Sequence, residues 1–336
     1  MNQNLIFMPN WIGDALMALA VIKKKTALEG SAPHLLAADN LKPLLDSVSD
    51  YPIIPYNRRS RNSVYEAVRK IKKYSFSKVY LLPHSMRTAW IALNTWIPKR
   101  RGIAKEGRSI FLTERISKKL RNKKKHLVDE YAAVLETESM IPEDWDGILG
   151  DTPRRQPEYD LVFCPGAKYG PAKQWQDYPG LAEIMDPLNI TVLGTKEDKA
   201  YGEKIRAVSP SRITNLAGRT SIKDAVEVIS TSRLVISNDS GLMHLASYLG
   251  VPVVGIFGST SPDWTRPLGK KSVVLSSNLE CAPCFKRECP FGHYNCLKSI
   301  SKESAAQTAH NILSVNSEKP ENILEFCPSV NENLYS

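Results

Sequence analysis

An aspartate near the start of the chain stands where an enzyme could place a general base. The run Pro-Asn-Trp-Ile-Gly-Asp at residues 9–14 follows a short apolar segment and opens a segment with helical periodicity. Gly13 would let a ligand approach the backbone, and the helix dipole favours an ionised carboxylate at Asp14. Asp14 could therefore take a proton from a substrate hydroxyl. The same spacing is also typical of an aspartate that only caps the helix.

A second polar turn could bind a diphosphate. Residues 238–241, Asn-Asp-Ser-Gly, follow an apolar run and open another helical segment. The backbone amides of Ser240 and Gly241 would point outward at the positive end of that helix, which favours anions. His244 could donate to a phosphate oxygen, whereas Asp239 could orient amides or neighbouring side chains. A capping turn with a packed His244 is the alternative.

A loop rich in glycine and proline at residues 165–175 carries two lysines, Lys168 and Lys173. Glycine lets the backbone approach a diphosphate, and a lysine can offset the charge of a departing phosphate group. The loop is not a P-loop of the Walker A type, because it lacks the Gly-Lys-Ser/Thr sequence. A plain surface loop is the alternative.

Four cysteines lie close together in the sequence: Cys281, Cys284, Cys289 and Cys296, with His293 between the last two. This density is typical of a structural zinc or iron–sulfur site, although the spacing is shorter than in a zinc ribbon. A reduced loop without a metal and a pair of disulfides are the alternatives. No signal peptide is visible at the N-terminus, so we expect a reducing cytoplasm.

The elements that must position these residues follow an α/β pattern. Apolar runs predict strands at 4–8, 35–38, 78–82, 159–164, 190–193, 234–237 and 253–257. Helical periodicity predicts helices at 13–28, 126–141, 221–232 and 241–249. The polar loops come directly after predicted strands, at the edge where open parallel sheets bind ligands.

The length and a boundary in the composition predict two domains. Residues 142–158 hold many prolines, glycines and charges, which is typical of a linker. We therefore expect an N-terminal domain over 1–150, a C-terminal domain over 159–315 and a loosely held tail over 316–336. Both domains are predicted to be Rossmann-like and to face each other across a cleft.

The formal net charge of +10 calls for an anionic partner. Basic residues form two clusters, one with Arg58, Arg59 and Arg61, and a second that contains Arg115, Lys118, Lys119, Arg121, Lys123, Lys124 and Lys125. Solvated surface loops are the alternative interpretation. No apolar stretch is long enough to span a bilayer. Nucleic-acid binding is not favoured, because no known binding motif appears and the basic runs lack interleaved aromatic residues.

Four motifs in this order resemble the signatures of the ADP-heptose:lipopolysaccharide heptosyltransferases, and most closely their heptosyltransferase II branch. They are Pro-Asn-Trp-Ile-Gly-Asp at 9–14, Pro-Gly-Ala-x-x-Gly-Pro-Ala-Lys-x-Trp at 165–175, Asn-Asp-Ser-Gly-Leu-Met-His-Leu-Ala at 238–246 and Gly-Ser-Thr-Ser-Pro-Asp-Trp at 258–264. The resemblance runs from about residue 5 to residue 268. The first three of these motifs, taken in the right order, are far more specific than any single one.

The resemblance implies a GT-B fold and heptose transfer from ADP-heptose to the inner core of lipopolysaccharide. It implies inversion at the anomeric carbon by direct displacement, without a metal or other cofactor. The N-terminal domain would bind the acceptor, with Asp14 as the base and Ser85 near the acceptor cleft. The C-terminal domain would bind the donor, with Lys173 stabilising the departing ADP. The other donor-site residues implied are Thr220, Glu197, Asp239, Ser240, Gly241 and His244.

The basic clusters would hold an acidic, phosphorylated acceptor at the cytoplasmic face of the inner membrane. Lys168 departs from the family pattern, because an acidic residue is expected there. Heptosyltransferases I and III and a hexose transferase of the same fold remain as alternatives. From other classes, a non-catalytic basic nucleotide- or nucleic-acid-binding protein remains, and so does a metal-dependent redox protein built on the cysteines. The redox interpretation leaves the motifs at Asp14, Lys173 and Asp239 unexplained.

Overall fold

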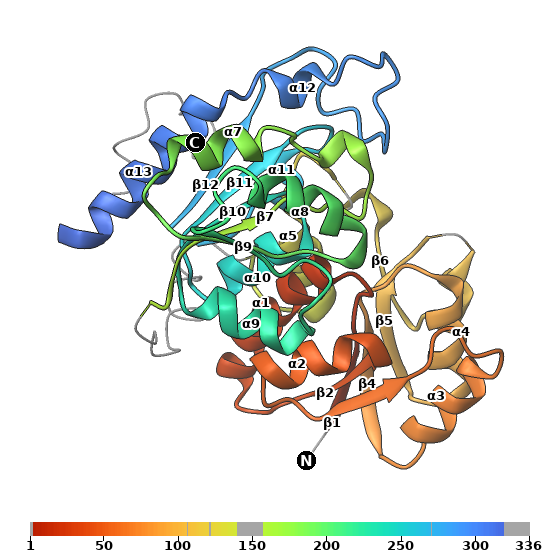
Figure 1. Ribbon diagram of the computed structural model, residues 1–336. Coiled ribbons are helices and arrows are strands. Elements are labelled where there is room, and N and C mark those ends of the chain that lie inside the picture. Colours follow the sequence, from red (N-terminus) through yellow and green to blue (C-terminus); the bar gives the residue numbers. More distant parts are fainter. Residues whose placement is uncertain (1–2, 106, 121, 140–156, 270, 319–336) are drawn as a thin grey trace. The chain divides into compact units, whose positions relative to one another are not determined.

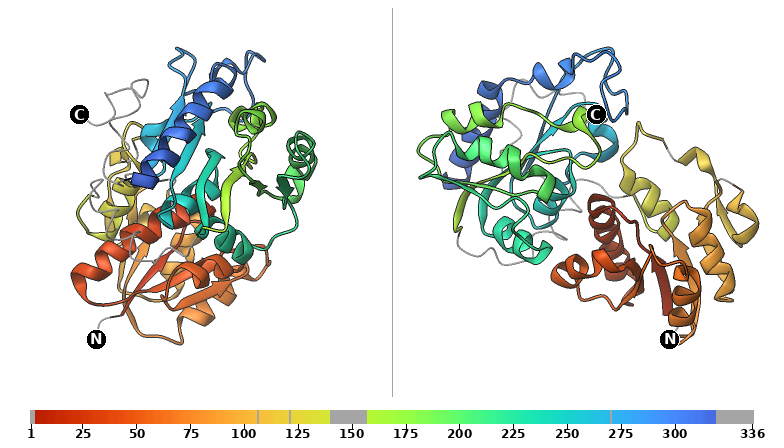
Figure 2. Two further views of the ribbon diagram at one scale, coloured as in Figure 1. Left: turned by 60° about the vertical axis from the view of Figure 1, so that its left-hand side comes forward. Right: turned by 45° about the vertical axis from the view of Figure 1, so that its right-hand side comes forward.

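The computed structural model describes residues 3–105, 107–120, 122–139, 157–269 and 271–318. The chain divides into two compact units (Figures 1 and 2). The first comprises Met1–Asn122 and Leu127–Ile141, and the second comprises Lys123–His126 and Pro142–Ser336. Among the described residues, no helix is long and apolar enough to cross a membrane.

The first unit is built on a parallel sheet with the strand order β3-β2-β1-β4-β5-β6. Its strands are β1 (Gln3–Phe7), β2 (His34–Ala38), β3 (Ile53–Tyr56), β4 (Phe76–Leu81), β5 (Lys99–Ile103) and β6 (Glu114–Ile116). The chain reverses its direction of travel across the sheet between β1 and β4. In open α/β sheets ligands bind at the carboxyl ends of the strands beside such a switch point.

Helices cover both faces of this first sheet (Figure 2). They are α1 (Ile12–Glu29), α2 (Lys42–Val48), α3 (Ser63–Ile71), α4 (Met86–Asn94) and α5 (Leu127–Leu135), with the short 3-10 helices η1 (Asp39–Leu41), η2 (Arg108–Phe111) and η3 (Lys118–Leu120). Helices α1 and α5 contact each other, and so do α3 and α4. Leu5 and Phe7 of β1 pack in one core with Ala67 of α3 and Ala89 of α4. Burial on both faces of the sheet explains why the last three residues of β1 are all apolar.

The second unit repeats the same plan with the strand order β12-β11-β10-β7-β8-β9, again all parallel. Its strands are β7 (Tyr159–Cys164), β8 (Ile190–Val192), β9 (Ile213–Asn215), β10 (Ser232–Asn238), β11 (Val253–Phe257) and β12 (Ser272–Ser276). Here the switch point lies between β7 and β10. The loops that follow these two strands are the lysine loop, residues 165–175, and the polar turn at Asp239 and Ser240.

The helices of the second unit are α7 (Tyr178–Ile184), α8 (Lys199–Arg206), α9 (Ile222–Ser230), α10 (Gly241–Tyr248), α11 (Pro262–Thr265), α12 (Asn295–Lys298) and α13 (Lys302–Glu318), with η4 (Pro171–Lys173) and η5 (Lys196–Asp198). Helix α13 contacts α7 and the central strands β10 and β11, whereas α9 and α10 contact each other (Figure 1). Trp175 and Tyr178 belong to the core between the sheet and α13.

The prediction of two Rossmann-like α/β domains is confirmed, and the strands predicted at 159–164 and 253–257 are confirmed to the residue as β7 and β11. The helix predicted at 126–141 is shorter, because α5 ends at Leu135. The predicted boundary at residue 150 and most of the predicted linker lie outside the described residues. Helix α13 extends to Glu318, into the segment predicted as a tail, and the remainder of that segment also lies outside them.

Candidate functional site

Asp14 lies at the carboxyl edge of the first sheet, next to the switch point. Helix α1 starts directly after the loop that follows β1, and its N-cap residue is Trp11. Asp14 is the third residue of the helix and is half-buried. Asp14 is therefore not the N-cap residue itself, and its choice between a catalytic and a capping role stays a prediction. A carboxylate in the first turn remains close to the positive end of the helix dipole.

The loop after β4, residues 82–85, lies on the other side of this switch point, and three side chains hold it. Ser85 caps α4 by accepting the backbone N–H of Thr88 at 3.3 Å. His84 Nε2 lies 2.7 Å from Oε1 of the buried Glu130 in α5. The fully buried Arg108 donates to the carbonyl oxygen of Pro83. Ser85 thus has at least a structural role at the predicted acceptor edge.

In the second unit, Lys173 and Asp239 are brought together at the switch point. The Lys173 ammonium donates to Oδ2 of Asp239, and only 12% of the lysine side chain and 4% of the aspartate side chain are exposed. The hydroxyl of Thr260, in the loop after β11, donates to the same oxygen at 2.6 Å. Two predicted donor-site residues therefore form one largely buried ion pair.

The lysine loop is held in place by the end of β10. The fully buried Asn238 donates its amide N–H to the carbonyl oxygen of Pro165 at 2.6 Å and accepts the backbone N–H of Trp175 at 3.2 Å. One side chain thus fastens both ends of the loop. Gly170 has φ of 145°, and a Cβ atom there would lie 2.5 Å from the carbonyl oxygen of Arg287. Only glycine fits this position.

Ser240 and Gly241 form the start of helix α10, as predicted from the sequence. Ser240 is the N-cap residue in an extended conformation, and its hydroxyl lies 3.2 Å from the hydroxyl of Ser237. The helix begins at Gly241, so its first amides are at the carboxyl edge of the sheet beside the Lys173–Asp239 pair. His244 is buried one turn further on. A helix N-terminus beside a lysine is a physically sound site for an anion.

The two residues predicted less firmly as nucleoside contacts follow the next two strands. Glu197 lies in η5 after β8 and is exposed, and Thr220 lies after β9 and precedes the capping Ser221 of α9. A hydrogen bond from Thr195 is the main factor that lowers the pKa of Glu197, and the nearby Lys168 adds to it. Within the described part of the chain, no hydrogen bond or ion pair joins either residue to Asp239. Glu197 and Thr220 lie at the same carboxyl edge of the second sheet as Asp239.

Comparison with known proteins decides the class of this site. The model of glycosyltransferase family 9 (heptosyltransferase) matches residues 64–295. The chain belongs to glycosyltransferase family 9. It is similar to lipooligosaccharide heptosyltransferase 2 of Haemophilus influenzae, with 28% identity over 92% of this chain and 99% of the relative. The corresponding protein of Haemophilus ducreyi is 29% identical over 92% and 99%.

The fold agrees with this assignment. The solved structure of the Escherichia coli ADP-heptose lps heptosyltransferase II matches with a TM-score of 0.75 and 24% identity, covering 94% of this chain and 100% of that one. The predicted GT-B arrangement of two parallel-sheet domains is thereby confirmed at the level of the fold. The protein is a glycosyltransferase. The roles of the individual site residues named above stay predictions.

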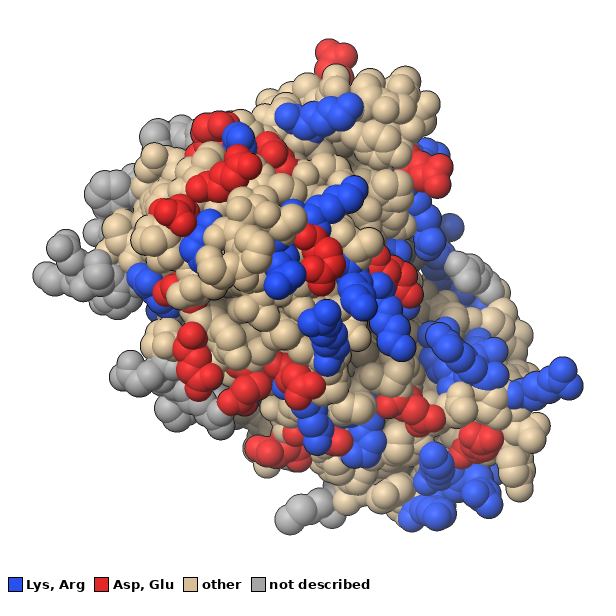
Figure 3. All heavy atoms as spheres, viewed as in Figure 1, with Lys and Arg blue, Asp and Glu red and all other residues tan. Residues whose placement is uncertain are grey.

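The two basic clusters predicted from the sequence of this family 9 transferase are exposed where the structure describes them. Arg58, Arg59 and Arg61 lie in the loop between β3 and α3, and Arg115 lies in β6. Figure 3 shows Lys and Arg side chains gathered over the region of α3 and α4. In a parallel sheet the loop after β3 opens at the same edge as the loop that leads to Asp14. Arg121 of the second cluster lies outside the described residues.

The cysteine segment contacts the lysine loop. The hydroxyl of Tyr169 donates to the carbonyl oxygen of Phe285 at 2.6 Å, and the backbone N–H of Ala172 donates to the carbonyl oxygen of Arg287 at 3.0 Å. The four cysteines are free thiols, namely Cys281, Cys284, Cys289 and Cys296. Among the described residues, no group of three or more His, Cys, Asp or Glu is arranged to hold a metal ion. The structural zinc stays a prediction.

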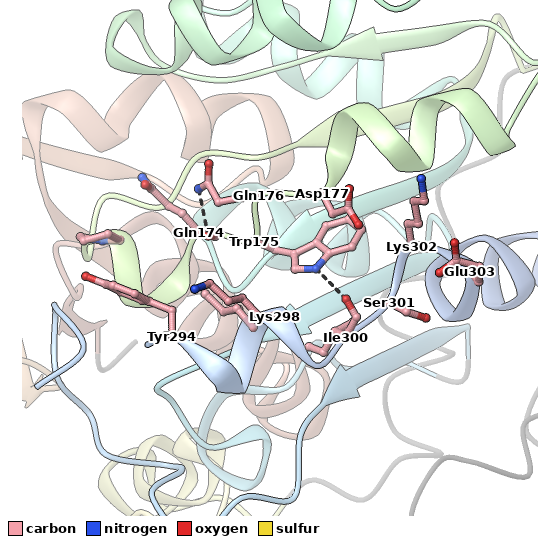
Figure 4. Close-up of a pocket in the computed structure, with 12 residues that line it drawn as sticks. Gln174, Trp175, Gln176, Asp177, Tyr294, Lys298, Ile300, Ser301, Lys302 and Glu303 are labelled. Atoms are coloured by element: carbon pink, nitrogen blue, oxygen red, sulfur yellow. Dashed lines mark hydrogen bonds between the residues drawn. The ribbon is translucent and has the colours of Figure 1, made fainter. Parts of the chain in front are cut away.

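A cavity of about 600 Å³ lies beside the far end of the lysine loop (Figure 4). One wall is formed by Pro171 and residues 174–177, and the other by the segment from Tyr294 to the start of α13. The indole N–H of Trp175 donates to the carbonyl oxygen of Ile300 at 2.9 Å and joins the two walls. Neither Lys173 nor Asp239 lines this cavity, so it is distinct from the ion pair.

His126 is a neighbour of the site that the sequence did not reveal. Its segment, Lys123–His126, groups with the second unit although both flanking segments belong to the first. The imidazole Nε2 lies 3.1 Å from the carbonyl oxygen of Arg266. Burial lowers the pKa of His126 to about 3, although the hydrogen bond to the Arg266 carbonyl oxygen favours the charged form. The charge of the Arg266 side chain and the nearby His244 oppose the charged form as well.

We predict that His244 makes the stability of the protein depend on pH. Burial lowers the pKa of His244 to about 4 from an unfolded value of 6.5. Between pH 6.5 and 4 the unfolded chain binds a proton that the folded chain does not, so the free energy of unfolding falls as the pH falls. The contribution is at most about 1.4 kcal/mol per pH unit, and it is constant above pH 6.5.

Urea unfolding at pH 8, 6 and 5 measures this dependence, and the His244→Gln variant is the control. The variant should show a shallower fall in the free energy of unfolding between pH 6.5 and 5. Equal slopes for the variant and the wild-type protein would contradict the prediction.

Proposed function

We propose that the protein transfers L-glycero-D-manno-heptose from ADP-heptose to the heptose/Kdo inner core of lipopolysaccharide. The observation that carries this proposal is the buried Lys173–Asp239 pair beside the N-terminus of α10. Relatives named heptosyltransferase 2 support the choice of sugar and acceptor, because they align over 92% of this chain. The solved relative with a matching fold is also named for ADP-heptose.

The donor half of the proposed reaction takes place on the second unit. The diphosphate of ADP-heptose lies over the amides of Ser240 and Gly241, where the helix dipole favours negative charge. The ammonium of Lys173 neutralises the charge that develops as ADP leaves. His244, which its low pKa keeps uncharged at neutral pH, donates one N–H without adding charge. Glu197 and Thr220 are proposed to contact the nucleoside.

The acceptor half of the proposed reaction uses the first unit. The carboxylate of Asp14 takes the proton of the acceptor hydroxyl as its oxygen bonds to the anomeric carbon. The bond from that carbon to the diphosphate breaks on the opposite side, which inverts the configuration. Asp14 then holds the proton, and ADP departs as the anion. No step needs a metal or another cofactor.

We further propose that the exposed arginines after β3 bind the acidic, phosphorylated acceptor. The loop that carries Arg58, Arg59 and Arg61 opens at the sheet edge that also presents Asp14. Positive side chains there would attract phosphate groups of lipid A and the anionic inner leaflet. This supports peripheral attachment at the cytoplasmic face of the inner membrane.

A product analysis tests the proposed function. Purified protein is incubated with ADP-heptose and either an acceptor that ends in heptose or one that ends in Kdo, and the products are identified by mass spectrometry. We expect ADP release and addition of one heptose to the heptose-terminated acceptor. Transfer only to the Kdo-terminated acceptor would instead assign heptosyltransferase I activity. Binding of ADP without transfer to either acceptor would favour a different sugar or acceptor position.

A further inference from the structure

One carboxylate oxygen in the second unit receives two donors from different loops. Oδ2 of Asp239 accepts the ammonium of Lys173, from the loop after β7, and the hydroxyl of Thr260, from the loop after β11. Thr260 is 8% exposed and Asp239 is 5% exposed. At this depth hydrogen bonds to a charged group are strong, because little water competes for them.

The backbone below Lys173 is fixed, so only its side chain is free to change partner. Ala172 donates its N–H to the carbonyl oxygen of Arg287 at 3.0 Å and accepts the N–H of Ser259 at 3.1 Å. Gly170 packs against the same Arg287 carbonyl. The ring of Tyr169 lies 4.9 Å from the Lys173 ammonium and provides a second favourable contact for it.

We infer that Asp239 is a resting clamp on Lys173, loosened by Thr260, that the diphosphate of the donor must open. This inference rests on the proposed function, because it assigns the diphosphate to Lys173. The incoming phosphate oxygens compete with Asp239 for the same ammonium. The hydroxyl of Thr260 occupies part of the acceptor capacity of Asp239 and so weakens its hold on Lys173. Thr260 is thus a positioning residue that sets nucleotide affinity through Asp239.

The clamp predicts opposite effects for two conservative substitutions. In Asp239→Asn the competing charge is gone, so ADP should bind about fivefold more tightly, which corresponds to the net worth of one hydrogen bond. Turnover should fall in this variant, because ADP leaves more slowly. In Thr260→Val the carboxylate holds Lys173 more strongly, and ADP should bind about fivefold more weakly. Thr260→Ser keeps the hydroxyl and should restore wild-type affinity.

Isothermal titration of ADP into the full-length protein and each variant tests the clamp. Ser261→Ala serves as the matched control. Ser261 follows Thr260 in the same loop and is the N-cap residue of α11, but its side chain makes no capping hydrogen bond. We expect its affinity for ADP to equal that of the wild-type protein. Thermal unfolding of each variant shows whether it is folded. Should Thr260→Val not fold, Thr260→Ala removes the same hydroxyl with a smaller side chain and is expected to weaken ADP binding in the same way, and Asp239→Asn tests the competing charge independently.

The outcomes separate this inference from the proposed function. A wild-type protein that binds no ADP contradicts the proposed function itself. A wild-type protein that binds ADP, with Asp239→Asn binding more weakly or equally, overturns the clamp alone. So does a folded Thr260→Val variant whose affinity is unchanged or increased. Opposite shifts in the two variants, with rescue by serine, support the clamp.

Discussion

Replacing Asp14 by Asn should lower turnover by about 10²–10⁴-fold, the usual contribution of general-base catalysis. The asparagine amide has nearly the same size and keeps the helix intact, but it cannot accept the proton of the acceptor hydroxyl. ADP should bind to Asp14→Asn as it binds to the wild-type protein, because Lys173, Ser240 and Gly241 are unchanged. The measurements are steady-state ADP release with donor and acceptor, and calorimetric titration of ADP.

Asp39→Asn is the matched control for this variant. Asp39 is an exposed carboxylate in the first turn of η1, which follows β2 at the same edge of the first sheet. It shares the position after a strand but lies further from the switch point. Turnover within about twofold of wild type is expected for an exposed surface change. Near-normal turnover in Asp14→Asn would show that another group takes the proton.

Replacing Lys173 by Ala should reduce both ADP affinity and turnover. Loss of one hydrogen bond to a charged group costs about 1.5–3 kcal/mol, which corresponds to roughly a 10–150-fold weaker affinity. Turnover should fall further, by about 10²–10³-fold, because the charge develops most fully as ADP leaves. Unchanged ADP affinity would remove Lys173 from the donor site.

Lys173→Ala should also destabilise the folded protein, and this effect must be separated from the loss of activity. Without Lys173 the buried carboxylate of Asp239 loses its counter-ion, which should destabilise the protein by about 3–5 kcal/mol. The double variant Lys173→Ala/Asp239→Asn removes both charges and should recover most of the stability. ADP affinity should remain below that of Asp239→Asn alone. Lys168→Ala, an exposed lysine in the same loop, shows how much of the loss reflects general electrostatics.

The parts of the fold that could be predicted from the sequence are those buried on both faces. Strands β7 and β11 are continuous apolar runs, and their limits were predicted to the residue. Strand β5 was missed because it reads Lys-Arg-Arg-Gly-Ile. The guanidinium of Arg100 donates hydrogen bonds to the carbonyl oxygens of Phe111 and Ile97. A strand of charged residues whose side chains are hydrogen-bonded in the fold contains no apolar run from which it could be predicted.

The candidate site shows the same division. Lys173 and Asp239 could each be proposed from a motif, since loops after parallel strands end at one edge. Their pairing through one oxygen, and the part played by Thr260, depends on three loops meeting and could not be predicted from spacing. Glu130 looks like any solvent-facing residue of an amphipathic helix, yet it is 3% exposed beside His84. Its partner lies far away in the sequence, in the loop after β4, so no local spacing indicates the contact.

The assignment of Lys123–His126 to the second unit has a practical consequence for dissecting the enzyme. The polypeptide passes from one unit to the other at residues 122–123, 126–127 and 141–142. Severing it at residue 150 would leave this four-residue strip, with the imidazole that meets the Arg266 carbonyl, on the wrong fragment. The N-terminal fragment would carry residues 123–126, and the C-terminal fragment would lack them. Mixing the two separately produced fragments and measuring recovered activity would therefore be more informative than studying either fragment alone.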